Sequence, residues 1–279
     1  MKLLVEPEKK NVEYDSDGLI LALEDFSVES VCYYTMDEIQ DIKNHYHGEL
    51  FIKVNRNFFN EDIASLKEIL ISLDQMGVDG VFFYDLAVLQ IKRELNLKLN
   101  LIWNQTHMVN NYRTCDYYYE KGVKYALLGK EITLDEIKEI LLKSKVQCMV
   151  EVVSRPSVAF SKRKLVSNYY SDLKETGEKE LLVQEKVTGD FYRVMEDSYG
   201  TCFFLDKITN GTSVIKELFE CNCPYIIMRE YGVDSFDELV SDTKEYILGG
   251  CKNLEYVSKY EKLGDSSNFF FKKTIYKVK

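Results

Sequence analysis

Short apolar runs alternate with amphipathic segments along most of this chain. Eight runs of four to six residues, rich in Val, Ile, Leu or Phe, are typical of strands that are buried on both faces. They are Lys2–Val5, Gly18–Leu23, Leu50–Val54, Gly80–Tyr84, Asn100–Trp103, Lys124–Leu128, Cys148–Val153 and Tyr225–Met228.

Helical patterns lie between these runs. Apolar residues recur every three or four positions in Glu61–Gln75. Asp85 is a candidate N-cap for a helix over Leu86–Leu95, and Thr133 with Glu136 resembles a capping box. The last two predicted helices are Val214–Phe219 and Phe236–Leu248.

Strands that alternate with helices predict parallel pairing, because parallel neighbours need a crossover connection. Eight strands at this spacing predict an α/β fold, a (β/α)8 TIM-type barrel. An open doubly wound sheet is the alternative, but no GxGxxG follows the first strand, so its dinucleotide-binding form lacks support.

Two segments interrupt the regular alternation. Glu6–Asp17 is too short and polar for a first crossover helix, which leaves the closure of the barrel open at that point. Residues 156–210 are too long for an ordinary loop, and Leu181–Val194 predicts a β-hairpin around a Thr-Gly-Asp turn. We therefore expect one barrel domain over residues 1–279, an insertion over 156–210 at the carboxyl face after strand seven, and a C-terminal extension over 251–279.

Composition places the chain among globular proteins. Its 279 residues are 46% hydrophobic and 29% charged, enough apolar material for a large core. The net charge of −10 argues against non-specific binding to nucleic acid, although a local basic patch is compatible with it. Seven scattered cysteines without a CxxC, and no secretion signal, predict reduced thiols and a cytoplasmic location; no apolar run approaches the roughly 18 residues that span a membrane.

In a barrel of this type the candidate functional side chains follow the carboxyl ends of the strands. His107 is the candidate for proton transfer, with a structural histidine as the alternative. Glu151 lies in an otherwise apolar strand and needs a partner, for which Arg155 and Arg163 are candidates; the pair would bind an anionic ligand or stabilise the barrel mouth. The candidates at strand ends are Glu24, Asn55, Asp85, Asn104, Thr106, His107, Glu131, Glu151, Ser154 and Arg155.

From these residues we predict catalytic roles for His107 and Glu151. The predicted ligand-binding residues are Asn55, Asp85, Thr106, Arg155, Arg163 and Lys164. For Asp85, a role as helix N-cap is the better explanation, with substrate orientation as the alternative. The basic run Ser161–Lys164 would meet phosphate or carboxylate, or form a solvated loop. No metal site is predicted, and neither HExxH nor GxSxG occurs.

Several segments resemble those of a known family in order and spacing. They are VDGVFFYDLAVLQ (Val78–Gln90), LIWNQTHMVNNY (Leu101–Tyr112), LLGKEITLDEI (Leu127–Ile137), FSKRKLVSNYY (Phe160–Tyr170), EDSYGT (Glu196–Thr201) and SNFFFKKTIYKV (Ser267–Val278). The family is the U32 peptidase-like, or collagenase-like protease, family. Within it, the chain resembles the short partner of a two-protein set linked to 5-hydroxyuridine at the tRNA wobble base.

The resemblance implies a barrel and, for better-understood members, hydroxylation that uses a [4Fe–4S] cluster on four cysteines, with prephenate implicated for some. The family's first cluster cysteine would align with Lys164, and no cysteine occurs from Met149 to Thr201. We therefore expect no cofactor on this chain. Its expected partners are a cluster-bearing U32 paralogue and either tRNA or an anionic small molecule, but no membrane.

Three hypotheses about function remain at this point. The first is an accessory subunit for tRNA wobble-uridine hydroxylation, acting with the cluster-bearing paralogue. The second is an enzyme in its own right, a U32-type peptidase or hydrolase or a small-molecule-binding barrel, which would use the strand-end residues Thr106, His107, Glu151 and Arg155. The third is a degenerate barrel that serves as a binding scaffold.

Overall fold

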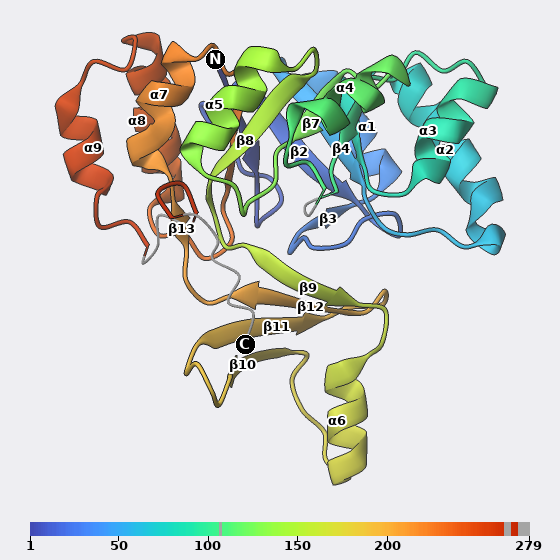
Figure 1. Ribbon diagram of the computed structural model, residues 1–279. Helices are drawn as coiled ribbons and strands as arrows, with labels where there is room; N and C mark the ends of the chain where they lie inside the picture. The colour runs from blue at the N-terminus through green and yellow to red at the C-terminus, as the bar shows by residue number, and fades with distance from the viewer. Residues whose placement is uncertain (106–107, 265–268, 273–279) are drawn as a thin grey trace.

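Eight parallel strands close into a barrel in the computed structural model, which describes residues 1–105, 108–264 and 269–272 (Figure 1). Around the barrel the order is β1-β14-β8-β7-β6-β5-β4-β2, and β2 pairs with β1 to complete the ring. The strands are β1 (Lys2–Glu6), β2 (Gly18–Leu23), β4 (Glu49–Val54), β5 (Gly80–Phe83), β6 (Leu101–Trp103), β7 (Tyr125–Leu127), β8 (Gln147–Ser154) and β14 (Tyr225–Arg229). The predicted (β/α)8 fold is confirmed.

The barrel closes although its first crossover, residues 7–17, contains no helix. Leu4 and Val5 pair directly with Gly18 and Leu19 in parallel register. Gly18 suits this position because a Cβ there would lie 2.6 Å from the carbonyl oxygen of Glu49, closer than side chains tolerate. The short connection therefore lacks a crossover helix, but the barrel still closes.

Helices cover the outside of the barrel, as the amphipathic pattern predicts. The caps predicted at Asp85 and at Thr133 with Glu136 are both formed. Among the described residues, no helix is long and apolar enough to cross a bilayer. The helices described around the barrel are α1 (Met36–His45), α2 (Ile63–Met76), α3 (Leu86–Glu94), α4 (Tyr112–Glu120), α5 (Leu134–Lys143), α7 (Ile215–Glu220), α8 (Phe236–Leu248) and α9 (Leu254–Tyr260).

After β8 the chain leaves the barrel and builds a second, antiparallel sheet, which lies apart from the ring in Figure 1. The predicted hairpin is confirmed, with Leu181 opposite Val194, but two further strands extend it to the order β10-β11-β12-β9. The elements are β9 (Ser157–Ser161), α6 (Leu165–Leu173), β10 (Glu180–Gln184), β11 (Phe191–Glu196) and β12 (Thr201–Leu205). Two short strands, β3 (Tyr33–Tyr34) and β13 (Thr209–Asn210), pair with β2 and β8.

Glu196 ties helix α6 to this sheet. Its buried carboxylate accepts hydrogen bonds from the backbone N–H groups of Val166, at 2.8 Å, and Ser167, at 3.0 Å, and from the Ser167 hydroxyl. Lys164 immediately precedes this capped helix. The Glu196 carboxylate therefore accepts hydrogen bonds from backbone N–H groups in the first turn of α6, which have no acceptor within the helix.

Replacing Glu196 by alanine is expected to loosen α6, because buried N–H groups would lose their acceptor at a cost of about 1–3 kcal/mol. Hydrogen exchange measured by mass spectrometry should show faster exchange in α6 peptides and unchanged exchange in barrel strands. Glu178→Ala, at an exposed position in the same insertion, is the matched control. Equal exchange in both variants would contradict the assigned role.

Candidate functional site at the barrel mouth

A layer of charged side chains lies inside the barrel, directly above its apolar interior. Side chains two residues apart on a strand point to the same face. Met149 and Ile227 belong to the apolar interior cluster, so Glu151 and Arg229, two positions further on, also point inward. The same step leads from Leu4 to Glu6 and from Phe51 to Lys53.

The inward charges form one connected ion-pair network. Lys53 Nζ lies 2.9 Å from Glu6 Oε1, and Arg229 bridges the two acids, at 3.1 Å from Glu6 Oε2 and 2.7 Å from Glu151 Oε2. Lys130, from the loop after β7, lies 3.0 Å from Glu151 Oε1. All five side chains are at most 15% exposed, so water screens these pairs poorly.

The network keeps Glu151 ionised. Burial alone would raise the pKa of this carboxyl, but the charges of Arg229 and Lys130 outweigh it and lower the pKa to about 2. The pKa of Glu6 is lowered in the same way, with Arg229 and Lys53 outweighing its burial. A carboxylate with a pKa near 2 is a weak base and has no proton to give near neutrality, which favours a structural role for Glu151 over acid–base catalysis.

The partners of Glu151 differ from those that the sequence indicates. Arg155, which follows the same strand, lies 3.2 Å from Asp206 Oδ1 and over the ring of Tyr231, so it links the barrel to the inserted sheet. Arg163 is exposed beyond β9. Lys130 and Arg229 were both missed, and Lys130 lies in the loop after β7, where an ion pair with a distant segment leaves no local signal.

Other predicted site residues hold backbone in place. Asn55 donates to the Val28 carbonyl at 3.2 Å and accepts from the Val28 N–H at 3.1 Å. Asp85 accepts from the N–H groups of Phe58, at 3.0 Å, and Ala87, at 2.9 Å. Both therefore shape the loops around the mouth rather than present unused polar atoms.

The remaining predicted residues fall into two groups. Lys164 is exposed like Arg163, and both follow strand β9. Thr106 and His107 lie outside the described residues, so their predicted roles stay predictions.

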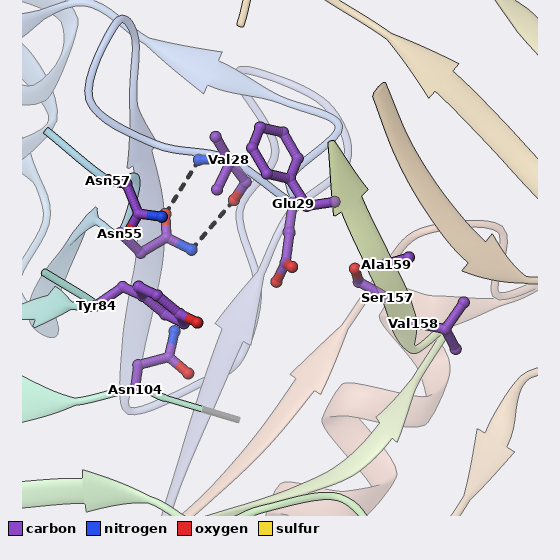
Figure 2. Close-up of a pocket in the computed structure, with 10 residues that line it drawn as sticks. Val28, Glu29, Asn55, Asn57, Tyr84, Asn104, Ser157, Val158 and Ala159 are labelled. Carbon is purple, nitrogen blue, oxygen red and sulfur yellow. Dashed lines mark hydrogen bonds between the residues drawn. The ribbon is translucent and has the colours of Figure 1, made fainter. Parts of the chain in front are cut away.

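A cavity of about 330 Å³ opens beside the ion-pair network. The residues that directly follow β4, β5 and β6 form one wall of the cavity, and the inserted strand β9 forms the opposite wall (Figure 2). Asn104 is 6% exposed, and its buried Oδ1 has no hydrogen-bond partner among the residues that the structure describes. The lining residues are Val28, Glu29, Asn55, Asn57, Tyr84, Asn104, Ser157, Val158, Ala159 and Phe160.

Sequence reasoning selected Asn55 and Asn104 at this cavity but missed Glu29 and Asn57. Both missed residues lie in loops, several positions beyond the ends of their strands. Lys53 and Arg229 carried a detectable signal, because each is a charged residue in an apolar strand, in the same setting that drew attention to Glu151.

The cysteines present do not fit a four-thiolate cluster. Cys148 and Cys223 lie near each other at the amino-terminal ends of β8 and β14, opposite the mouth, with Cys223 Sγ 4.0 Å from the Cys148 carbonyl oxygen. Burial raises the pKa of Cys223 and of Cys202, in β12, to about 12, so both are thiols near neutrality. Within the described ranges, no three His, Cys, Asp or Glu side chains are grouped to hold a metal ion.

Three comparisons with known proteins add to this geometry. The chain is 28% identical over 264 residues to tRNA hydroxylation protein P2 of Bacillus subtilis, covering 82% of this chain and 81% of that one. It is 23% identical over 173 residues to tRNA hydroxylation protein P1 of the same bacterium, covering 59% of this chain but only 40% of P1.

A solved structure, the 3-hexulose-6-phosphate synthase of Salmonella typhimurium, superposes with a TM-score of 0.50 over 90% of this chain and all of that one, at 10% identity, which reflects the barrel fold alone. A family model provides the assignment. The model for peptidase family U32 matches residues 6–229, about four fifths of the sequence, and the chain therefore belongs to the U32 peptidase family.

Proposed function

We propose that this protein is an accessory subunit for hydroxylation of the tRNA wobble uridine and works with a cluster-bearing U32 paralogue. The observation that carries the proposal is its similarity to protein P2 over four fifths of both chains, together with a shorter match to protein P1. Two related proteins of the same bacterium, both named for tRNA hydroxylation, favour a two-component system. Such a pair would act in the cytoplasm.

The side chains of the mouth support an accessory rather than a redox role. The cysteines do not offer a cluster site, and both inward carboxylates are held in ion pairs. In the proposed pair, the paralogue supplies the cluster chemistry, and this chain supplies binding surface and positioning. The absence of a cofactor on this chain stays a prediction.

Deleting the gene for this protein in its source organism is expected to abolish 5-hydroxyuridine in tRNA, as measured by mass spectrometry of digested tRNA. The complex purified without oxygen should contain the paralogue and iron, whereas this chain purified alone should contain neither iron nor acid-labile sulfide. Restoring the gene should restore the modified nucleoside.

Unchanged 5-hydroxyuridine in the deletion strain would reject the proposal. Stoichiometric iron on the isolated chain would reject the accessory assignment, because the chain would then hold its own cluster.

A further inference from the structure

The inserted sheet ends in a strand that, among the described residues, pairs on one side only. This strand, β10, comes last in the order β9-β12-β11-β10 and lies farthest from the barrel in Figure 1. Proline, lysine and bulges protect the edge strands of many soluble proteins against pairing with other chains. The five residues of β10 (ELLVQ) include neither proline nor lysine, and their pairing with β11 is continuous. The edge is therefore open to the addition of another strand.

Alternate residues of β10 direct their backbone groups away from the sheet. Just outside the strand, the Lys179 carbonyl oxygen accepts a hydrogen bond from β11, and the Glu185 N–H donates to the residue before β11, each at 2.9 Å. Residues that bond to the neighbouring strand alternate with residues that do not in an antiparallel pair. The N–H and carbonyl groups of Glu180, Leu182 and Gln184 therefore point outward, where a further strand would meet them.

Apolar side chains accompany these outward backbone groups. Leu182, at the centre of the strand, is 57% exposed. A groove of about 480 Å³ lies between the strand and helix α6, and its lining includes Leu181 and Val183 of β10 and Val166 and Tyr169 of α6. Exposed apolar surface of this kind marks a site of protein–protein contact.

The sequence of the strand is complementary to itself. Antiparallel pairing about a two-fold axis at Leu182 places Leu182 opposite its copy and Glu180 opposite Gln184 of the second copy. This register pairs all five residues of both strands and joins outward-pointing groups to outward-pointing groups. One position beyond the strand ends, Lys179 faces Glu185 of the second copy. Because the contact is symmetric, an attractive charge pair lies at both ends of the joined strands.

We propose that two copies of this chain associate through β10, which joins their two four-stranded inserted sheets into one sheet of eight strands. The contact would bury Leu182 of both copies and pair Leu181 of each with Val183 of the other. It leaves both barrel mouths free, because β9, at the opposite edge of the sheet, is the strand that lines the mouth cavity. The inference is independent of the proposed function.

The first test is sedimentation equilibrium of the full-length protein over about a hundredfold range of concentration, in which a reversible dimer is expected. Leu182→Asp should weaken the dimer by at least about tenfold, because it removes an apolar contact and places two carboxylates directly opposite each other. Leu142→Asp is the matched control. Leu142 is 84% exposed on helix α5 of the barrel, and its replacement should leave the dimer unchanged.

The second test reverses the charges at the strand ends. Lys179→Glu and Glu185→Lys each place like charges at both ends, so each variant alone should dimerise at least about tenfold more weakly. A mixture of the two variants restores both attractive pairs, and native mass spectrometry should detect the mixed dimer. Glu185 also accepts hydrogen bonds from the N–H groups of Val187 and Thr188 in its own turn. Recovery on mixing distinguishes the contact between copies from damage to that turn.

Three results would overturn the inference. They are a chain that stays monomeric at every concentration, a dimer that survives Leu182→Asp, and charge variants that do not associate when mixed. A monomer that instead forms a one-to-one complex with the paralogue, and loses it on Leu182→Asp, would also overturn it and would assign the edge to the paralogue.

Discussion

Replacing Glu151 by alanine is expected to lower the free energy of unfolding by about 3–5 kcal/mol, the range observed when one partner of a buried ion pair is removed. Glu151 is 3% exposed at its side chain and forms ion pairs with both Arg229 and Lys130. Without it, these two cations would repel each other in a poorly solvated barrel mouth. Equilibrium unfolding in urea, followed by circular dichroism, measures the change.

Two further variants separate charge from packing. Glu139→Ala removes one acid of an exposed pair with Lys143 and should cost less than about 1 kcal/mol. Glu151→Met combined with Lys130→Met should be more stable than Glu151→Met alone, because the second change removes one of the two cations that Glu151 pairs with in the barrel mouth. If Glu151→Ala and Glu139→Ala cost the same, the buried network would contribute nothing particular to stability.

The barrel was predictable because its strands are buried on both faces and therefore appear as continuous apolar runs. All eight predicted strands exist, with ends that differ by at most one residue. Helix α1 was missed although Thr35 and Glu38 form the same capping box that Thr133 and Glu136 form at α5. Helix α4 has mostly polar and aromatic residues and a single buried position, Cys115, which left its pattern weak.

The site was less predictable because its contacts join segments that are far apart in the sequence. Strand β9 pairs with β12 about 40 residues later, and neither has a clear alternation of apolar and polar residues. Glu6 and Arg229 are separated by most of the chain and meet only because β1 and β14 are neighbours in the closed ring. Local patterns therefore identified Glu151 as a buried charge but not what neutralises it.

The same network should make the protein labile in acid. The pKa of Glu151 is about 2 in the folded protein, compared with an ordinary 4.5. Because the unfolded chain binds the proton first, this contribution to stability is fully present above pH 4.5 and is lost as the pH falls towards 2. The difference corresponds to about 3 kcal/mol, at 1.36 kcal/mol for each pH unit.

Comparison with Glu151→Gln isolates this effect from the other carboxyl groups. The gap in unfolding free energy between the unmodified protein and Glu151→Gln should narrow by roughly 2 kcal/mol between pH 5 and pH 3, measured by urea unfolding at each pH. The gap for Glu139→Gln, at the exposed pair, should change far less over that range. A gap for Glu151→Gln that stays constant with pH would mean that the attraction of Arg229 and Lys130 only cancels the effect of burial on this carboxyl. A gap that widens as the pH falls would mean that burial, which favours the protonated acid, dominates at the barrel mouth.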